Sequence, residues 1–76
     1  MWSLAGMHVD VFQQRDDGGR LTGLVYLTER GGREPAKTPP YEWHKIHPGW
    51  CVAAGVASLI RRDGYCTARM VKLHTA

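Results

Sequence analysis

The chain has 76 residues, of which 43% are hydrophobic and 22% are charged, and its formal net charge is +3. This length predicts a single domain over residues 1–76, in which 1–6 form a flexible N-terminal segment. No apolar run approaches the roughly 20 residues that a membrane-spanning helix needs. The first seven residues also lack the basic and apolar regions of a secretory signal, so we expect a cytoplasmic protein without a membrane partner.

Two strands joined by a tight turn are predicted at the start of the chain. Met7–Phe12 alternates apolar and polar residues with a period of two. Asp16, Asp17, Gly18 and Gly19 follow, and residues of these types accept the positive φ values of a hairpin turn. Leu21–Arg30 is rich in β-branched and aromatic residues, so we expect it to pair antiparallel with the first strand.

The segment 31–49 is predicted to be a long loop, because it holds all four prolines of the chain and two adjacent glycines. We expect at most a short strand within it, at Trp43–Ile46. Loops of this length inside a compact domain are usually functional or mobile. Its aromatic side chains either pack onto the small core or bind a partner, and packing is the more economical use in so short a chain.

A helix is predicted over 50–62, where apolar residues recur at helical spacing among several alanines. Arg61 and Arg62 suit its last turn, and Gly64 suits the left-handed residue that ends many helices. Asp63-Gly64 is also typical of a hairpin, which would make the fold a small all-β barrel. The last segment, Tyr65–His74, has apolar residues on both faces, as a central strand does.

The predicted fold is therefore α+β: an antiparallel sheet of three to four strands with one helix packed on one face. The predicted order is strand, strand, long loop, helix, strand. The small all-β barrel remains the alternative.

The best candidate for a metal site is the trio His44, His47 and Cys51. Structural zinc takes four Cys or His ligands, and this trio could supply three of them if the loop folds back. Its spacing matches no usual zinc-finger pattern, and Pro48 intervenes. We therefore expect no metal and no cofactor, and a small zinc-stabilised module remains an alternative.

No catalytic residue is predicted, so we expect the protein not to be an enzyme. A Cys51 thiol activated by His47 would lack an acidic group to orient the histidine. The carboxylates are scattered, and the two Gly-Gly pairs match neither a dinucleotide-binding nor a P-loop pattern. Without a signal sequence, Cys51 and Cys66 are expected to stay reduced.

These absences favour a small binding module that acts through protein–protein interaction. Aromatic and Arg side chains are the usual anchors of interfaces, and the candidates are Tyr41, Trp43, Trp50 and Arg33. The size suits a regulator or stoichiometric inhibitor that blocks a partner surface, such as the anti-defence proteins of phages and mobile elements. The sequence leaves the partner's identity and a homodimer open.

A nucleic-acid-binding accessory protein is the alternative to a protein-binding module. The ten Lys and Arg residues exceed the seven acidic ones, but they form no run longer than two. This is a weak electrostatic pattern for binding phosphates. The candidates for that role are Arg33, Lys37, Arg61 and Arg62.

Overall fold

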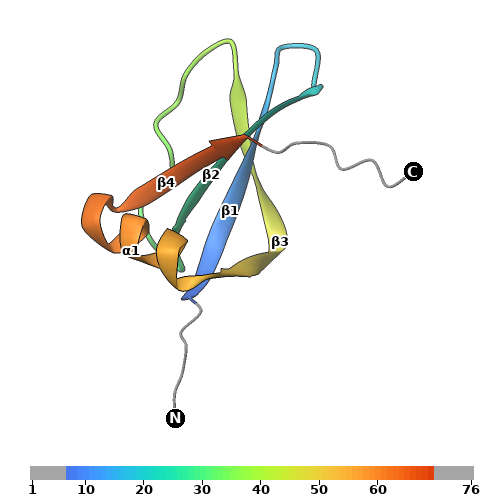
Figure 1. The fold of residues 1–76 in the computed structure, drawn as a ribbon. Coiled ribbons are helices and arrows are strands. Elements are labelled where there is room, and N and C mark those ends of the chain that lie inside the picture. Colours follow the sequence, from blue (N-terminus) through green and yellow to red (C-terminus); the bar gives the residue numbers. More distant parts are fainter. Residues whose placement is uncertain (1–6, 70–76) are drawn as a thin grey trace.

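The structure is a computed structural model, which describes residues 7–69 apart from the side chain of Pro48. The described part contains, in chain order, β1 (Met7–Arg15), β2 (Leu21–Glu29), β3 (Glu42–Val52), α1 (Ala54–Asp63) and β4 (Tyr65–Arg69). The strands form one antiparallel sheet in the order β3-β1-β2-β4. In Figure 1, α1 lies on the near side of the sheet and the segment between β2 and β3 passes behind it.

The predicted α+β class is confirmed, with one helix against an antiparallel sheet. The all-β barrel is wrong, because residues 54–63 are helical and no barrel closes: β3 and β4 lie at opposite edges of the sheet formed by residues 7–69. The predicted hairpin of the first two strands is confirmed as β1 and β2. The predictions for 1–6 and 70–74 lie outside the described residues.

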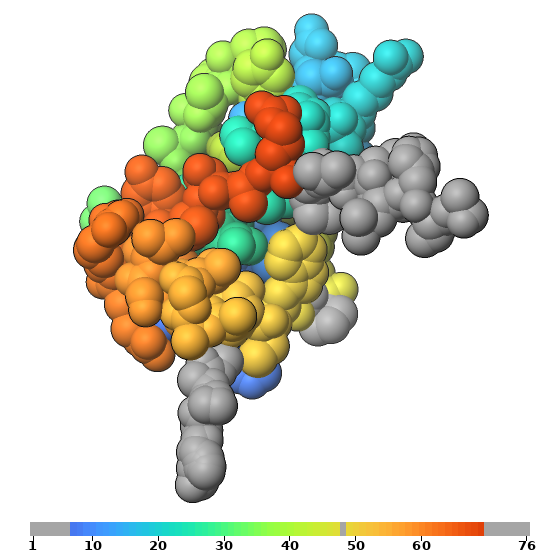
Figure 2. All heavy atoms as spheres, in the orientation of Figure 1, coloured from blue at the N-terminus to red at the C-terminus, as the bar shows by residue number. Residues whose placement is uncertain are grey.

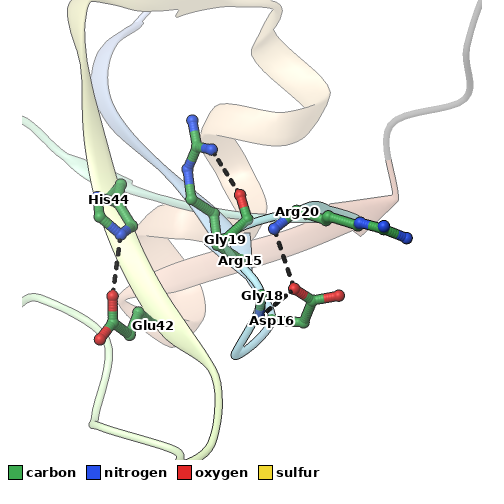
Figure 3. Close-up of polar contacts among 7 residues, drawn as sticks. All are labelled: Arg15, Asp16, Gly18, Gly19, Arg20, Glu42 and His44. Atoms are coloured by element: carbon green, nitrogen blue, oxygen red, sulfur yellow. Dashed lines mark hydrogen bonds and ion pairs between the residues drawn. The ribbon is translucent and has the colours of Figure 1, made fainter.

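The Asp16 carboxylate organises the turn of this hairpin (Figure 3). Its Oδ1 atom accepts hydrogen bonds from the backbone N–H groups of Gly18 and Arg20, each at 2.9 Å. Gly19 has a φ of 82°, a conformation that glycine adopts without steric cost. The Arg15 guanidinium donates to the Gly19 carbonyl at 2.9 Å, which ties the end of β1 to the turn.

The prediction of a loop over 31–49 is wrong in its second half, because β3 runs from Glu42 to Val52; the short strand expected at Trp43–Ile46 is confirmed as part of it. Val9 pairs with Trp50 and Val11 with Ile46, so three residues of β3, 47–49, lie opposite the single residue Asp10 of β1. Pro48 lies within this bulge. Proline is tolerated at bulges and on edge strands, because no ladder hydrogen bond depends on its nitrogen there. In chain order, β3 therefore lies between the shortened loop and the helix.

The helix begins at Ala54, later than the predicted 50, because Trp50–Val52 belong to β3. Its predicted end is confirmed: Gly64 has a φ of 88° and donates its N–H to the Ile60 carbonyl at 2.6 Å. Arg61 and Arg62 lie in the last turn, as predicted. No helix within residues 7–69 is long and apolar enough to cross a membrane.

The prediction that the last strand is central is wrong for Tyr65–Arg69, because β4 lies at one edge of the described sheet. Apolar groups on both faces favoured a central position. In the structure Cys66 packs against the core, whereas Tyr65 is 46% exposed on the other face. The Tyr65 ring stacks on a ring of the neighbouring strand. This edge strand therefore has apolar groups on both faces, the pattern that is typical of a central strand.

The core lies between the sheet and α1. β1 and β2 each contribute alternate residues to it, and the helix contributes the two residues of its buried face. In Figure 2, α1 and β4 cover much of the near face, over the strands that carry these residues. The buried cluster consists of Met7, Val9, Val11, Val25, Leu27, Ala57 and Ile60.

Substitutions of two adjacent helix residues test how α1 packs on the sheet. Ile60 is 2% exposed and Leu59 is 39% exposed. Ile60→Ala should lower the free energy of unfolding by about 2–4 kcal/mol, because it removes buried methyl groups and leaves a cavity. Leu59→Ala should lower it by about 0.5 kcal/mol or less. Urea unfolding followed by circular dichroism measures both values, and equal losses would contradict the proposed face of the helix.

Substitutions of two glycines test the close approach of β3 to β1 at the bulge. A Cβ atom on Gly49 would overlap the Val9 carbonyl oxygen, whereas one on Gly55 would meet no heavy atom within 4 Å. Gly49→Ala should therefore destabilise the protein by about 1–3 kcal/mol, because backbone must move. Gly55→Ala should stabilise it by about 0.5 kcal/mol, since alanine favours the helix. Thermal unfolding gives the sign of each change, and a neutral Gly49→Ala would refute the close approach of β3 to β1.

Candidate binding site

An aromatic side chain from each strand lies on the sheet face opposite α1, which we call the loop face. The four are Trp43 of β3, Phe12 of β1, Tyr26 of β2 and Tyr65 of β4. The Tyr26 ring centroid lies 6.1 Å from that of Phe12, 5.9 Å from Trp43 and 5.3 Å from Tyr65. The planes of Tyr26 and Tyr65 are 4° apart, so these rings stack. Each such pair contributes about 0.5–1.5 kcal/mol beyond the burial of its area.

The segment after β2 is fixed onto the loop face by three contacts. The Gly31 N–H donates to Oδ2 of Asp10 at 3.0 Å. A Cβ atom on Gly32 would overlap Oγ1 of Thr28, so the backbone there lies directly against β2. The Tyr26 hydroxyl donates to the Arg33 carbonyl at 3.4 Å. These contacts carry the chain across the side of the sheet that the helix leaves uncovered.

Farther along, the same segment and the sheet enclose a cavity of about 460 Å³. We call it the aromatic hollow. Rigid apolar groups make up most of its wall, and they come from β1, β3 and the connecting segment. The residues are Phe12, Trp43, Pro35, Pro39, Pro40 and Tyr41.

The polar residues that border the aromatic hollow are Glu34, Lys37, Glu42 and His44. His44 Nε2 lies 3.3 Å from Glu42 Oε1, as Figure 3 shows. Both side chains are at least half exposed, so this contact contributes little to stability. The rim is thus mixed in charge, with two carboxylates among its four groups.

The indole N–H of Trp43 is buried and has no hydrogen-bond partner among the described residues. Tryptophan Nε1 can only donate. Leaving such a donor unsatisfied costs about 1–3 kcal/mol. The Trp43 ring lines the aromatic hollow but its Nε1 atom is covered, so an acceptor on a bound ligand could remove this cost only if the indole turned toward it.

A second cavity, of about 800 Å³, lies at the bulge of β3. We call it the basic hollow. Its charged and titratable lining comes from β1, from the turn after β2 and from β3. The residues are His8, Asp10, Arg30, Lys45 and His47.

Asp10 connects the parts of the basic hollow. Its Oδ2 atom accepts the Gly31 N–H and lies 3.4 Å from Nζ of Lys45, and the Asp10 side chain is 13% exposed. The hydrogen bond from Gly31 holds the pKa of this carboxyl below its ordinary value. Burial acts in the opposite direction, and Lys45 and Arg30 lower the pKa further. The ionised carboxylate is therefore the form that the fold stabilises.

This pKa shift predicts a pH dependence of stability. Near pH 7, Asp10→Asn should lower the free energy of unfolding by about 1 kcal/mol. A carboxyl whose pKa is depressed by folding contributes fully above its unfolded value of about 4, and the contribution disappears as the pH falls through the folded value. Urea unfolding of both proteins from about pH 6 to about pH 2 should show the difference shrinking. A difference independent of pH would contradict the role of the charge.

The four predicted protein-binding residues do not form one patch. Tyr41 and Trp43 meet in the aromatic hollow. Arg33 is exposed, and its carbonyl contacts Tyr26. Trp50 packs against the core cluster and borders the basic hollow. Phe12 and Tyr26 were not predicted as part of the site, although their types and strand positions could have indicated it.

The four predicted nucleic-acid-binding residues are also separated. Arg33 and Lys37 belong to the segment on the loop face, whereas Arg61 and Arg62 lie at the end of α1 on the other side of the sheet. Arg62 pairs with Asp63 at 3.0 Å.

The three candidate ligands of the alternative zinc site are also separated. His44 borders the aromatic hollow and contacts Glu42, while His47 borders the basic hollow. Cys51 is an exposed free thiol, and Cys66 is free and half-buried. Within residues 7–69 there is no group of three or more His, Cys, Asp or Glu that could hold a metal ion.

The two hollows are neighbours on the loop face. Phe12 borders one and Asp10 borders the other, and alternate residues of a strand lie about 7 Å apart. The face thus offers an apolar compartment with an unsatisfied donor beside a compartment with basic groups. Comparisons of the chain with family models, with curated proteins and with solved structures return no match.

Proposed function

We propose that the protein binds an extended segment of another protein in the aromatic hollow. The observation that carries this proposal is Trp43, whose ring lines the cavity and whose buried indole N–H has no acceptor among the described residues. A main-chain carbonyl of an extended segment would accept that hydrogen bond once a rotation of the indole turns the N–H toward the cavity. Its apolar side chains, proline in particular, would fill the space between the aromatic rings.

The size and rigidity of the hollow support a peptide ligand. Its volume of about 460 Å³ falls in the ordinary range for ligand pockets. Proline rings and aromatic side chains have few rotatable bonds, so little conformational entropy is lost when they make contacts. The exposed side of Tyr41, which is 41% accessible, extends the apolar surface beyond the cavity.

A single-stranded nucleic acid fits this face less well. Stacking of bases requires accessible ring faces. Tyr26 already stacks on Tyr65 and packs against two further rings, and Phe12 is 4% exposed. Glu34 and Glu42 on the rim would also repel phosphates. We therefore expect this face to bind a peptide in preference to a single-stranded nucleic acid.

We further propose that the bound partner is regulated or inhibited by having its surface blocked. The small size of the chain, 76 residues, supports this proposal, because a small protein acts most simply by occupying a surface of its partner. A regulator or stoichiometric inhibitor of the phage or mobile-element type remains the proposed class.

The test is a selection of binders from a displayed library of random peptides containing a fixed central proline. Trp43→Phe removes the N–H donor together with one ring of the indole and keeps a smaller aromatic ring, so the affinity of selected peptides should fall about tenfold. Tyr41→Ala should also weaken binding, and its exposed position predicts a stability change of about 0.5 kcal/mol or less. Trp43→Ala is less informative, because that ring packs against Tyr26.

Tyr65→Phe is the matched control, since this exposed ring belongs to the loop face but does not border the aromatic hollow. Calorimetric titration gives the affinities, and melting curves verify folding. The proposal fails if no peptide is selected, or if Tyr65→Phe and Trp43→Phe weaken binding equally. Tighter binding of a single-stranded oligonucleotide, with a steep dependence on salt, would instead favour the nucleic-acid role.

A further inference from the structure

We propose that the basic hollow is an oxyanion site, occupied by an acidic side chain of the segment that the aromatic hollow binds. The identity of the carrier rests on the proposed function. The site itself rests only on the groups that line the cavity at the bulge of β3.

The lining has an excess of positive groups. Arg30 and Lys45 are cations, and His8 and His47 supply imidazole N–H donors, against the single carboxylate of Asp10. Among residues 7–69, Arg30 makes no ion pair within 4.0 Å. A guanidinium presents a planar pair of donors that matches the two oxygens of a carboxylate or phosphate. Arg30 is therefore the group best placed to accept an oxyanion.

Asp10 positions this cluster. Its carboxylate ties Gly31, the neighbour of Arg30 in the chain, to β1, and it holds Lys45 of β3 at 3.4 Å. Two basic residues from different elements are thereby brought to one cavity. Because the Asp10 side chain is 13% exposed and already has two partners, it is largely withdrawn from the ligand space.

The spacing of the hollows suits an extended chain. Phe12 and Asp10 are alternate residues on one face of β1, about 7 Å apart. Alternate side chains of an extended segment have the same spacing. A segment lying along this face can therefore place an apolar side chain in one hollow and an acidic side chain in the other.

The first experiment titrates the full chain with sodium phosphate, followed by amide NMR spectra, with sodium chloride at equal ionic strength as the reference. Saturable shifts are expected at His8, Arg30, Gly31, Lys45 and His47. Arg30→Gln should weaken phosphate binding about threefold to fivefold. Trp43→Phe should leave it unchanged, which separates this site from the aromatic hollow.

Arg20→Gln is the matched control, because it removes the same charge from the hairpin turn. Arg20 bonds Asp16 through its backbone alone, because its N–H donates to Asp16 Oδ1 and its carbonyl accepts the Asp16 N–H, so the turn should survive. Equal weakening by Arg20→Gln and Arg30→Gln would show general charge attraction and overturn the site. Shifts in phosphate that match those in chloride would overturn it as well.

The second experiment identifies the carrier of the oxyanion. A selected peptide with a Glu residue is compared with its Gln analogue on the wild type and on Arg30→Gln. The Glu peptide should bind the wild type at least about threefold more tightly, and this preference should disappear in Arg30→Gln. Phosphate binding without such coupling would assign the site to a free anion and overturn the peptide carrier. If no peptide is selected, the proposed function fails while the phosphate titration still decides the site.

Discussion

A four-stranded sheet has two faces, and in residues 7–69 there is one helix to cover them. The helix shields Val9, Val11 and their neighbours on one side. On the other side the cover is an irregular segment, held by Asp10 through Gly31 and by Tyr26 through Arg33. Because irregular backbone cannot pack as evenly as a helix, this side retains cavities and an unsatisfied indole donor. The features that suit binding thus arise from how the second face is covered.

The sequence allowed the local elements to be predicted well and the long-range pairing poorly. Asp16 acts through hydrogen bonds to its near neighbours, and Gly19 and Gly64 act through their positive φ, so these features can be predicted without the rest of the chain. β3 depends on a partner instead. Pro48 would interrupt the hydrogen bonds of a regular strand pair. It is accommodated because β3 forms a bulge opposite β1 at this point, and no local sequence pattern predicts that bulge. Whether this segment forms a strand therefore depends on pairing with a strand that is remote in the sequence.

The candidate site was predictable in part for the same reason. Tyr41 and Trp43 are close in sequence and remain together in the structure, so composition alone could indicate them. Phe12, Tyr26 and Asp10 join the site through register, since Phe12 faces Tyr26 across β1 and β2. Trp50 was separated from Trp43 because it pairs with the core-facing Val9, whereas Trp43 pairs with Gln14 on the loop face. Which face a residue occupies thus depends on its register with the partner strand.

The bulge of β3 also affects how the molecule behaves among its own copies. A long outer strand with an unbroken row of backbone N–H and C=O groups invites another chain to add to the sheet. In β3 the row is interrupted where three residues, 47–49, lie opposite one residue of β1, and the proline there has no N–H to donate. The outer edge of β3 is therefore divided into two short stretches, and neither is long enough to pair well with a strand of another chain. The irregularity that shapes a cavity on one side thus protects against edge-to-edge aggregation on the other.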